Sequence, residues 1–184
     1  GNNARALRVT PIFADRVRMA AEDIVKKIDL DKTLECALAS DPDDACVRAS
    51  IEKFGAKAFR RPLTETEIKR YVVLYGMARH LDFAPVAWQT VIAAFLQSPN
   101  FLYRTEIGRT ELGRTQTSGG NSATLTTLEP YEVANALSYF FWPSMPDEAL
   151  FAAAADGSLL NTAGIEKQAR RLLASPRAKA TLDH

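Results

Sequence analysis

Three glutamates are the residues best suited to catalysis in this sequence. Glu129 and Glu132 are three residues apart, so a helix would present both carboxylates on one face, as bimetal and acid/base sites require. Glu106 is a third possible acid or base. However, Glu129 and Glu132 also fall in the first turns of a predicted helix, where the helix dipole stabilises negative charge. We favour that structural interpretation and predict no catalytic residue.

Few other side chains suggest a metal or cofactor site. The two histidines, His80 and His184, have no Cys, Asp or Glu at metal-ligand spacing, and the sequence contains no Cys-x-x-Cys-His or His-Glu-x-x-His. Met145 precedes Pro146 in a predicted turn, where its thioether could ligate a haem iron held by another domain. Filling a gap in the core is the commoner role of such a methionine. We therefore predict no cofactor and no metal in this segment.

Arg60 and Arg61 are expected to have a structural role. They stand between an apolar helical pattern and Pro62, a position that predicts partial burial. Buried guanidinium groups need carboxylate or carbonyl partners. Glu106 or Glu132 could supply the carboxylate, and the carbonyl groups at the end of the preceding helix are the equally favoured alternative.

The two cysteines, Cys36 and Cys46, flank a turn-forming stretch that contains Pro42. A disulfide between them would close a short loop and stabilise the fold by roughly 2–3 kcal/mol. The alternative is two unrelated thiols in the core. We favour the disulfide, which would place the protein in an oxidising compartment.

Composition identifies a packed globular protein. Hydrophobic residues make up 47% of the 184 residues and charged residues 24%, and the formal net charge of +1 gives no electrostatic reason to expect nucleic acid or an anionic membrane as partner. Residues 83–103 carry no charge, but Pro85 and Pro99 limit the helix between them to about a dozen residues. That is shorter than the roughly 18 residues that a membrane span needs, so we predict a buried core helix and no membrane span.

Helical periodicity recurs along the chain, and no segment alternates like a strand for more than four residues. We predict an all-α fold, an orthogonal or antiparallel bundle of eight or nine helices. Its parts are an N-terminal helical region over residues 1–112, a flexible Gly- and Ser-rich linker over 113–124 and a second helical region over 125–184. We also expect the native chain to continue beyond His184.

The second region contains a helix that is apolar on nearly every side. From Ala136 to Trp142 only Ser138 and the Tyr139 hydroxyl are polar, so we expect other helices to enclose this stretch, including Phe140. Trp142 is expected to be structural. Asp147 should be structural as well, because Ser144 and Asp147 have the spacing of a capping box that starts a helix over Glu148–Ala155.

Three strings support a resemblance to a known family. They are Phe-Arg-Arg-Pro-Leu-Thr at 59–64, Ser-Pro-Asn-Phe-Leu-Tyr-Arg at 98–104, and Leu-Ser-Tyr-Phe-Phe-Trp at 137–142 followed by Pro146 and Asp147. In this order and spacing the chain resembles large exported proteins of planctomycetes and myxobacteria. Those proteins are built from serial domains of unknown function and are often described as planctomycete-type cytochrome c proteins. The resemblance covers about residues 36–182, and proteins of this kind tend to carry a cysteine pair where Cys36 and Cys46 stand.

The resemblance implies an extracytoplasmic protein, periplasmic or on the cell surface, with c-type haem attached to other domains and a suspected role in electron transfer. Because this segment lacks a haem-attachment motif, we expect it to be a non-catalytic helical scaffold whose partners are other, possibly haem-bearing, domains or chains of the same protein. One alternative is an extracytoplasmic hydrolase that uses the three glutamates. The other is a plain protein-interaction domain.

Overall fold

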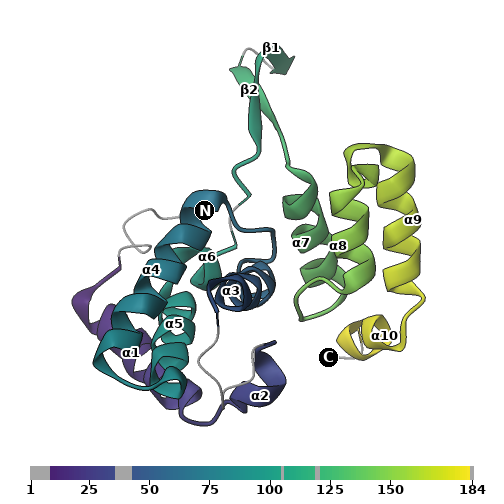
Figure 1. Cartoon of the computed structure of the whole chain (residues 1–184). Coiled ribbons are helices and arrows are strands. Elements are labelled where there is room, and N and C mark those ends of the chain that lie inside the picture. The colour runs from purple at the N-terminus through teal and green to yellow at the C-terminus, as the bar shows by residue number, and fades with distance from the viewer. Residues whose placement is uncertain (1–8, 36–42, 105, 119–120, 183–184) are drawn as a thin grey trace. The chain divides into compact units, whose positions relative to one another are not determined.

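The computed structural model describes residues 9–35, 43–104, 106–118 and 121–182. It confirms the all-α class: in this part of the chain there are ten α-helices, one short 3-10 helix and a single two-stranded hairpin (Figure 1). The number of helices is ten rather than eight or nine, and two of them, α2 and α6, are single turns of four residues. No helix in these ranges is long and apolar enough to cross a membrane.

The chain divides into two compact units, Gly1–Tyr103 and Arg104–His184. Helix α5 lies at the centre of the first unit and packs against α1, α3 and α4 (Figure 1). Its uncharged sequence buries seven side chains, including Trp88, Ile92 and Phe95, which confirms the prediction of a core helix. The helices of this unit are α1 (Pro11–Val25), α2 (Leu30–Thr33), α3 (Asp44–Phe59), α4 (Glu65–Leu81), α5 (Ala84–Gln97) and α6 (Pro99–Leu102).

Local sequence explains where the long helices of the first unit begin and end. Helix α1 starts with Pro11 after Thr10, whose hydroxyl accepts the Phe13 N–H. Helix α4 starts with the predicted capping box of Thr64 and Glu67. Helix α3 ends at Arg60, which adopts a left-handed backbone conformation with φ of 57°, a conformation uncommon for a non-glycine residue.

Aromatic rings fill the core between α3, α4 and α5. Tyr71 stacks on Phe95 with ring centres 3.7 Å apart, and Phe54 and Phe59 meet the same ring edge to face at 5.4 and 5.3 Å. Such rings contribute both a large buried apolar area and directional contacts. The three helices are therefore held at a defined spacing, which positions the side chains of the site described below.

A β-hairpin occupies the stretch that we predicted to be a flexible linker, so that expectation is corrected. Strands β1 (Arg109–Ser118) and β2 (Asn121–Thr127) pair antiparallel, with Ser118 opposite Asn121 and Arg109 opposite Thr127, and the register shifts between Thr110 and Thr115. Threonine is β-branched and favours an extended backbone, and the sequence carries six threonines between residues 110 and 127. The Gly- and Ser-rich composition of residues 113–124 is equally typical of a flexible connection, which is why the strands were not predicted.

The second unit buries an apolar core between its four helices. They are α7 (Pro130–Phe141), α8 (Glu148–Ala155), α9 (Thr162–Leu173) and α10 (Pro176–Leu182), with the 3-10 helix η1 (Ser158–Leu160) after α8 (Figure 1). Trp142, Leu150, Leu159 and Leu172 lie in this core. Helix α7 is not enclosed on every side as we expected, because Phe140 is 77% exposed while Trp142 is only 4% exposed.

The predicted capping box at Ser144 is also corrected. Helix α8 spans Glu148–Ala155 as expected, but its N-cap is Asp147 rather than Ser144, and the Asp147 carboxylate accepts the Leu150 N–H at 3.0 Å. The Ser144 carbonyl instead accepts the hydroxyl of buried Ser138 at 2.9 Å. The segment between α7 and α8 is thus tied back to α7, and Asp147 keeps its predicted structural role by a different contact.

Candidate functional site

Arg60 is the most deeply buried charged residue among those that the structure describes, with 7% of its surface exposed. Its guanidinium donates to the carbonyl oxygens of Asn100, Phe101 and Tyr103, at 2.8, 3.2 and 3.1 Å from Nη2. These carbonyl groups lie in and just after α6, so neither Glu106 nor Glu132 nor the end of the preceding helix is the partner. The burial was predicted correctly, but the partner was not. Arg60 holds the end of α6 against the end of α3.

Arg61 makes the second half of the same network. Its two terminal nitrogens donate to the two carboxylate oxygens of Glu67 at 2.9 and 2.8 Å, and Glu67 also accepts the Thr64 N–H at 2.8 Å and the Asn100 amide at 3.3 Å. The hydrogen bond from Arg61 is the main cause that lowers the pKa of Glu67 to about 2, against the opposing effect of burial. The strings at 59–64 and 98–104 therefore meet in space and bind each other.

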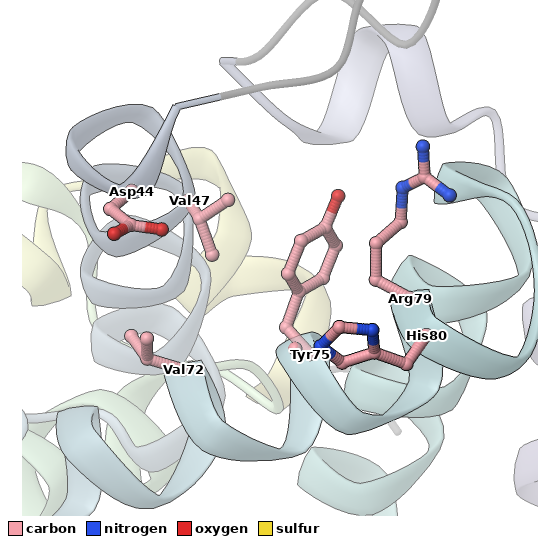
Figure 2. Close-up of a pocket in the computed structure, with 7 residues that line it drawn as sticks. Asp44, Val47, Val72, Tyr75, Arg79 and His80 are labelled. Atoms are coloured by element: carbon pink, nitrogen blue, oxygen red, sulfur yellow. The ribbon is translucent and has the colours of Figure 1, made fainter.

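A pocket opens elsewhere in the first unit, between α3 and the second half of α4 (Figure 2). Its volume is about 380 Å³, within the range of small-molecule sites, roughly 300–1,000 Å³. Helix α3 contributes Asp44 and Val47, one turn apart, and α4 contributes one continuous face. The residues of that face are Val72, Tyr75, Gly76, Arg79 and His80.

The pocket combines an apolar wall with ionisable groups. Tyr75 is buried, and its ring packs against Trp88 with ring centres 4.6 Å apart, so its position is set by the core. Arg79 extends from the last turns of α4, where its Nη1 donates to the Asp82 carbonyl at 3.1 Å. Figure 2 shows Asp44 and Val47 on α3 and Tyr75, Arg79 and His80 on α4. The arrangement can bind a small polar molecule that has an apolar part.

Sequence reasoning missed this pocket. We tested His80 only as a metal ligand, and among the described residues no three His, Cys, Asp or Glu side chains come together to hold a metal ion. The signal was the spacing of the α4 residues at i, i+3, i+4, i+7 and i+8, which defines one helical face. On that face Arg79 and His80 follow apolar residues and a glycine.

In the second unit, Asp147 and Trp142 share a structural network. Arg171 donates from both terminal nitrogens to the two Asp147 carboxylate oxygens at 2.7 and 2.9 Å, and the guanidinium groups of Arg171 and Arg177 lie over the Trp142 ring. The Trp142 indole N–H donates to the Leu172 carbonyl at 3.3 Å. Burial acts to raise the pKa of Asp147, but the hydrogen bond from Arg171 and the backbone contact at the cap outweigh it, so the pKa is lowered.

The three candidate glutamates are placed as follows. The Glu132 carboxylate accepts the backbone N–H groups of Ile107, Gly108 and Glu129, at 2.9, 3.0 and 2.8 Å. It therefore holds the segment before the hairpin against the start of α7. Glu129 is half-buried and Glu106 is exposed. None of the three is among the residues that line the pocket.

Two further candidates concern haem and disulfide chemistry. Met145 is 37% exposed between α7 and α8, and its role as a haem ligand stays a prediction. Cys46 is half-buried on α3 and packs against the core of the first unit. Cys36 lies outside the described residues, so the disulfide between the two cysteines also stays a prediction.

Two family models match the chain. Residues 46–106 match the model described as PSD5, a protein of unknown function (DUF1595), and residues 128–184 match the model described as PSD4, a protein of unknown function (DUF1592). The hairpin falls between the two matches. Neither the curated proteins nor the solved structures that were searched contain a significant match. Over these two segments the chain is therefore similar to two domains of unknown function, which fits the resemblance of its sequence strings to proteins built from serial domains of this kind.

Proposed function

We propose that this chain is a non-catalytic helical scaffold of a larger exported protein associated with c-type cytochromes. In this proposal the chain positions haem-bearing domains or subunits of the same protein, and electron transfer belongs to those partners. The compartment is extracytoplasmic, in the periplasm or on the cell surface. The haem is held outside this segment, because the sequence contains no Cys-x-x-Cys-His motif.

One observation carries the proposal: the distinctive charged residues of the family-like strings are engaged in contacts within their own unit. Arg60 binds three backbone carbonyl groups, and Arg61 binds Glu67. Asp147 caps α8 and binds Arg171. Side chains that bind backbone groups and one another in this way stabilise a fold and leave few polar atoms for a substrate. Scaffolding is the function that fits charged side chains engaged within their own unit in this way.

The proposal is tested on the native polypeptide that contains this chain, isolated with an antibody raised against the chain. We expect a reduced-minus-oxidised visible spectrum with the α band of c-type haem, and a haem-stained band that survives denaturing electrophoresis. The control is the 184-residue chain alone, produced in cells that attach c-type haem, which should bind none. Native material free of haem would contradict the proposal.

The compartment is tested by a separate measurement. Peptide mapping of the native protein under non-reducing and reducing conditions should show Cys36 and Cys46 joined, since a structural disulfide persists in oxidising compartments and is rare in reducing ones. Detection of both residues as free thiols in rapidly alkylated cells would count against export.

A further inference from the structure

We propose that the exposed side of α1 binds α1 of a second copy of this chain, in an antiparallel pair related by a two-fold axis. Helix α1 precedes both segments that the family models match, residues 46–106 and 128–184. None of its residues belongs to the networks of Arg60, Arg61 or Asp147. The proposal is therefore independent of the scaffold function, and either one can fail without the other.

Helix α1 buries only one narrow side. Ala21 and Val25 are its buried residues, Val17 is half-buried, and the helix packs against α5. The part before Val17 is exposed at every residue from 9 to 16. The side of α1 that faces away from α5 is therefore accessible over the length of the helix.

This accessible side carries large apolar side chains. Ile12 is 69% exposed, Phe13 42%, Met19 52% and Ile24 47%. Residues three, four and seven positions apart share one side of a helix, so these four lie on one surface, about 140° wide, which we call the α1 face. The residues of the α1 face are Ile12, Phe13, Arg16, Met19, Ala20, Asp23 and Ile24. An exposed apolar surface of this kind marks a site of association.

Two opposite charges lie within the α1 face. Arg16 and Asp23 are both exposed and seven residues apart, which is two helical turns or about 10 Å along the axis. In the described part of the chain Arg16 makes no hydrogen bond or ion pair, whereas the neighbouring Arg18 forms two ion pairs. Asp23 accepts a hydrogen bond from Lys26 at 3.2 Å, with both side chains 68% exposed. Such an exposed pair contributes little, so the Asp23 carboxylate is open to a second partner.

These two charges are self-complementary in one arrangement. When a two-fold axis passes between Met19 and Ala20 of two antiparallel helices, residue 16 of each chain lies opposite residue 23 of the other. Each Arg16 then meets the Asp23 of the second copy. A partner of uniform charge would neutralise one of the two groups and repel the other, whereas a copy of α1 satisfies both. The charge pattern therefore identifies a second copy as the occupant of the α1 face.

The apolar residues fit the same register. Met19 and Ala20 fall at the axis, where the small Ala20 side chain allows the usual spacing of about 8–10 Å between helices. Ile24 of one chain lies opposite residue 15 of the other, within one turn of Ile12 and Phe13. Apolar side chains therefore cover one another at both ends of the pair. Two helices of 15 residues bury less area than a standard interface, so we expect a dissociation constant of roughly 1–100 μM.

Sedimentation velocity of the 184-residue chain measures this association. We expect the average mass to rise from that of one chain to that of two as the concentration passes through the micromolar range. Arg16→Glu and Asp23→Lys should each abolish the dimer, because residue 16 then faces a like charge at residue 23 of the second copy. Both residues are exposed, so the melting temperature should change little. A wild-type chain that stays monomeric throughout the concentration series would overturn the proposal.

A chain with both substitutions tests the register. In the antiparallel pair the new glutamate faces the new lysine of the second copy, so Arg16→Glu combined with Asp23→Lys should restore the dimer. Arg70→Glu is the matched control, because Arg70 is an exposed arginine on α4, outside the α1 face, and its replacement changes the net charge by the same amount. It should leave the dimer intact. Dimerisation of either single variant with wild-type affinity, failure of the folded double variant to dimerise, or loss of the dimer in Arg70→Glu would overturn the proposal.

Discussion

Replacing Glu67 by glutamine tests how strongly the network of Arg61 holds the first unit. Glutamine has nearly the same shape as glutamate and can still serve as the fourth residue of the capping box at Thr64. The change therefore removes the negative charge that faces Arg61 while leaving the start of α4 intact. Arg61 would be left with a neutral acceptor in place of a carboxylate that now accepts two hydrogen bonds from it.

The size of the effect follows from the pKa of Glu67. A lowering from 4.5 to about 2 corresponds to roughly 3.4 kcal/mol of added stability for the charged form, at about 1.36 kcal/mol for each tenfold change in the acid constant. Water reaches the pair, because the side chains of Arg61 and Glu67 are 33% and 17% exposed. We therefore expect the substitution to lower the free energy of unfolding by about 1–2 kcal/mol at pH 7.

The pH dependence has a defined direction. Because folding lowers the pKa of Glu67, the carboxylate contributes its full stabilisation above about pH 4.5 and loses it as the pH falls toward about 2. The difference between the wild type and Glu67→Gln should therefore be constant from pH 7 to about pH 5. It should then decrease, so that most of it has disappeared at about pH 2.5.

Urea unfolding monitored by fluorescence measures the effect. The chain has two tryptophans, Trp88 in the first unit and Trp142 in the second, so a Trp142→Phe background leaves Trp88 as the reporter of the first unit. Glu65→Gln is the matched control, because Glu65 lies in the same turn of α4 and its ion pair with Arg48 is exposed. Equal unfolding free energies for Glu67→Gln and the wild type at pH 7, or a difference unchanged at pH 2.5, would refute the reasoning.

Four further substitutions test the other networks and the assigned burial. Arg60→Met should cost about 2–4 kcal/mol of unfolding free energy, since buried carbonyl groups lose a charged donor; an unchanged urea midpoint would contradict this. Asp147→Asn keeps a capping residue but loses the ion pair with Arg171, which should cost about 1 kcal/mol at pH 7, and the cost should fade as the pH falls below about 4; a loss that persists in acid would contradict it. Trp142→Ala should cost about 3–5 kcal/mol and Phe140→Ala less than about 0.5 kcal/mol, measured by circular dichroism; equal costs would contradict the assigned burial.

Helix starts could be predicted from the sequence because their determinants are local. Thr64 and Glu67 are three residues apart, and the two hydrogen bonds of their capping box involve only that one turn. The absence of charge in α5 likewise predicted its burial, since no orientation of that helix would present a charged face to water. Both inferences need only neighbouring residues, and both agree with the structure.

The partner of Arg60 could not be predicted because it depends on the path of the chain over some forty residues. Helices α4 and α5 separate Arg60 from Asn100 in the sequence, and only their packing brings α6 to the end of α3. From the sequence, carboxylates and the nearest helix end were the expected partners of Arg60. The actual partners are carbonyl groups in and after α6, which begins at Pro99.

The hairpin and Phe140 show two different limits on what amino-acid composition can predict. Threonine, serine and glycine are common both in flexible connections and in hairpins, so pairing of the two halves has to be known before the strands can be recognised. For α7, a high apolar content indicates that most faces are covered but does not identify the uncovered one. Phe140 and Trp142 are two residues apart, so they project to different sides of the chain, and only Trp142 reaches the core.

The charged residues of the strings and those of the pocket differ in how many contacts hold them. The charged residues of the strings bind carbonyl groups and one another, so substitutions such as Arg60→Met act on stability first, and any loss of function would follow from loss of the fold. Arg79, His80 and Asp44 line the pocket, and Arg79 also donates to the Asp82 carbonyl just after α4. Arg79→Met removes the hydrogen bond from Nη1 to the Asp82 carbonyl, so it should lower the free energy of unfolding of the first unit by about 0.5–1.5 kcal/mol. A loss as large as that of Arg60→Met in urea unfolding would contradict this ranking of the two arginines.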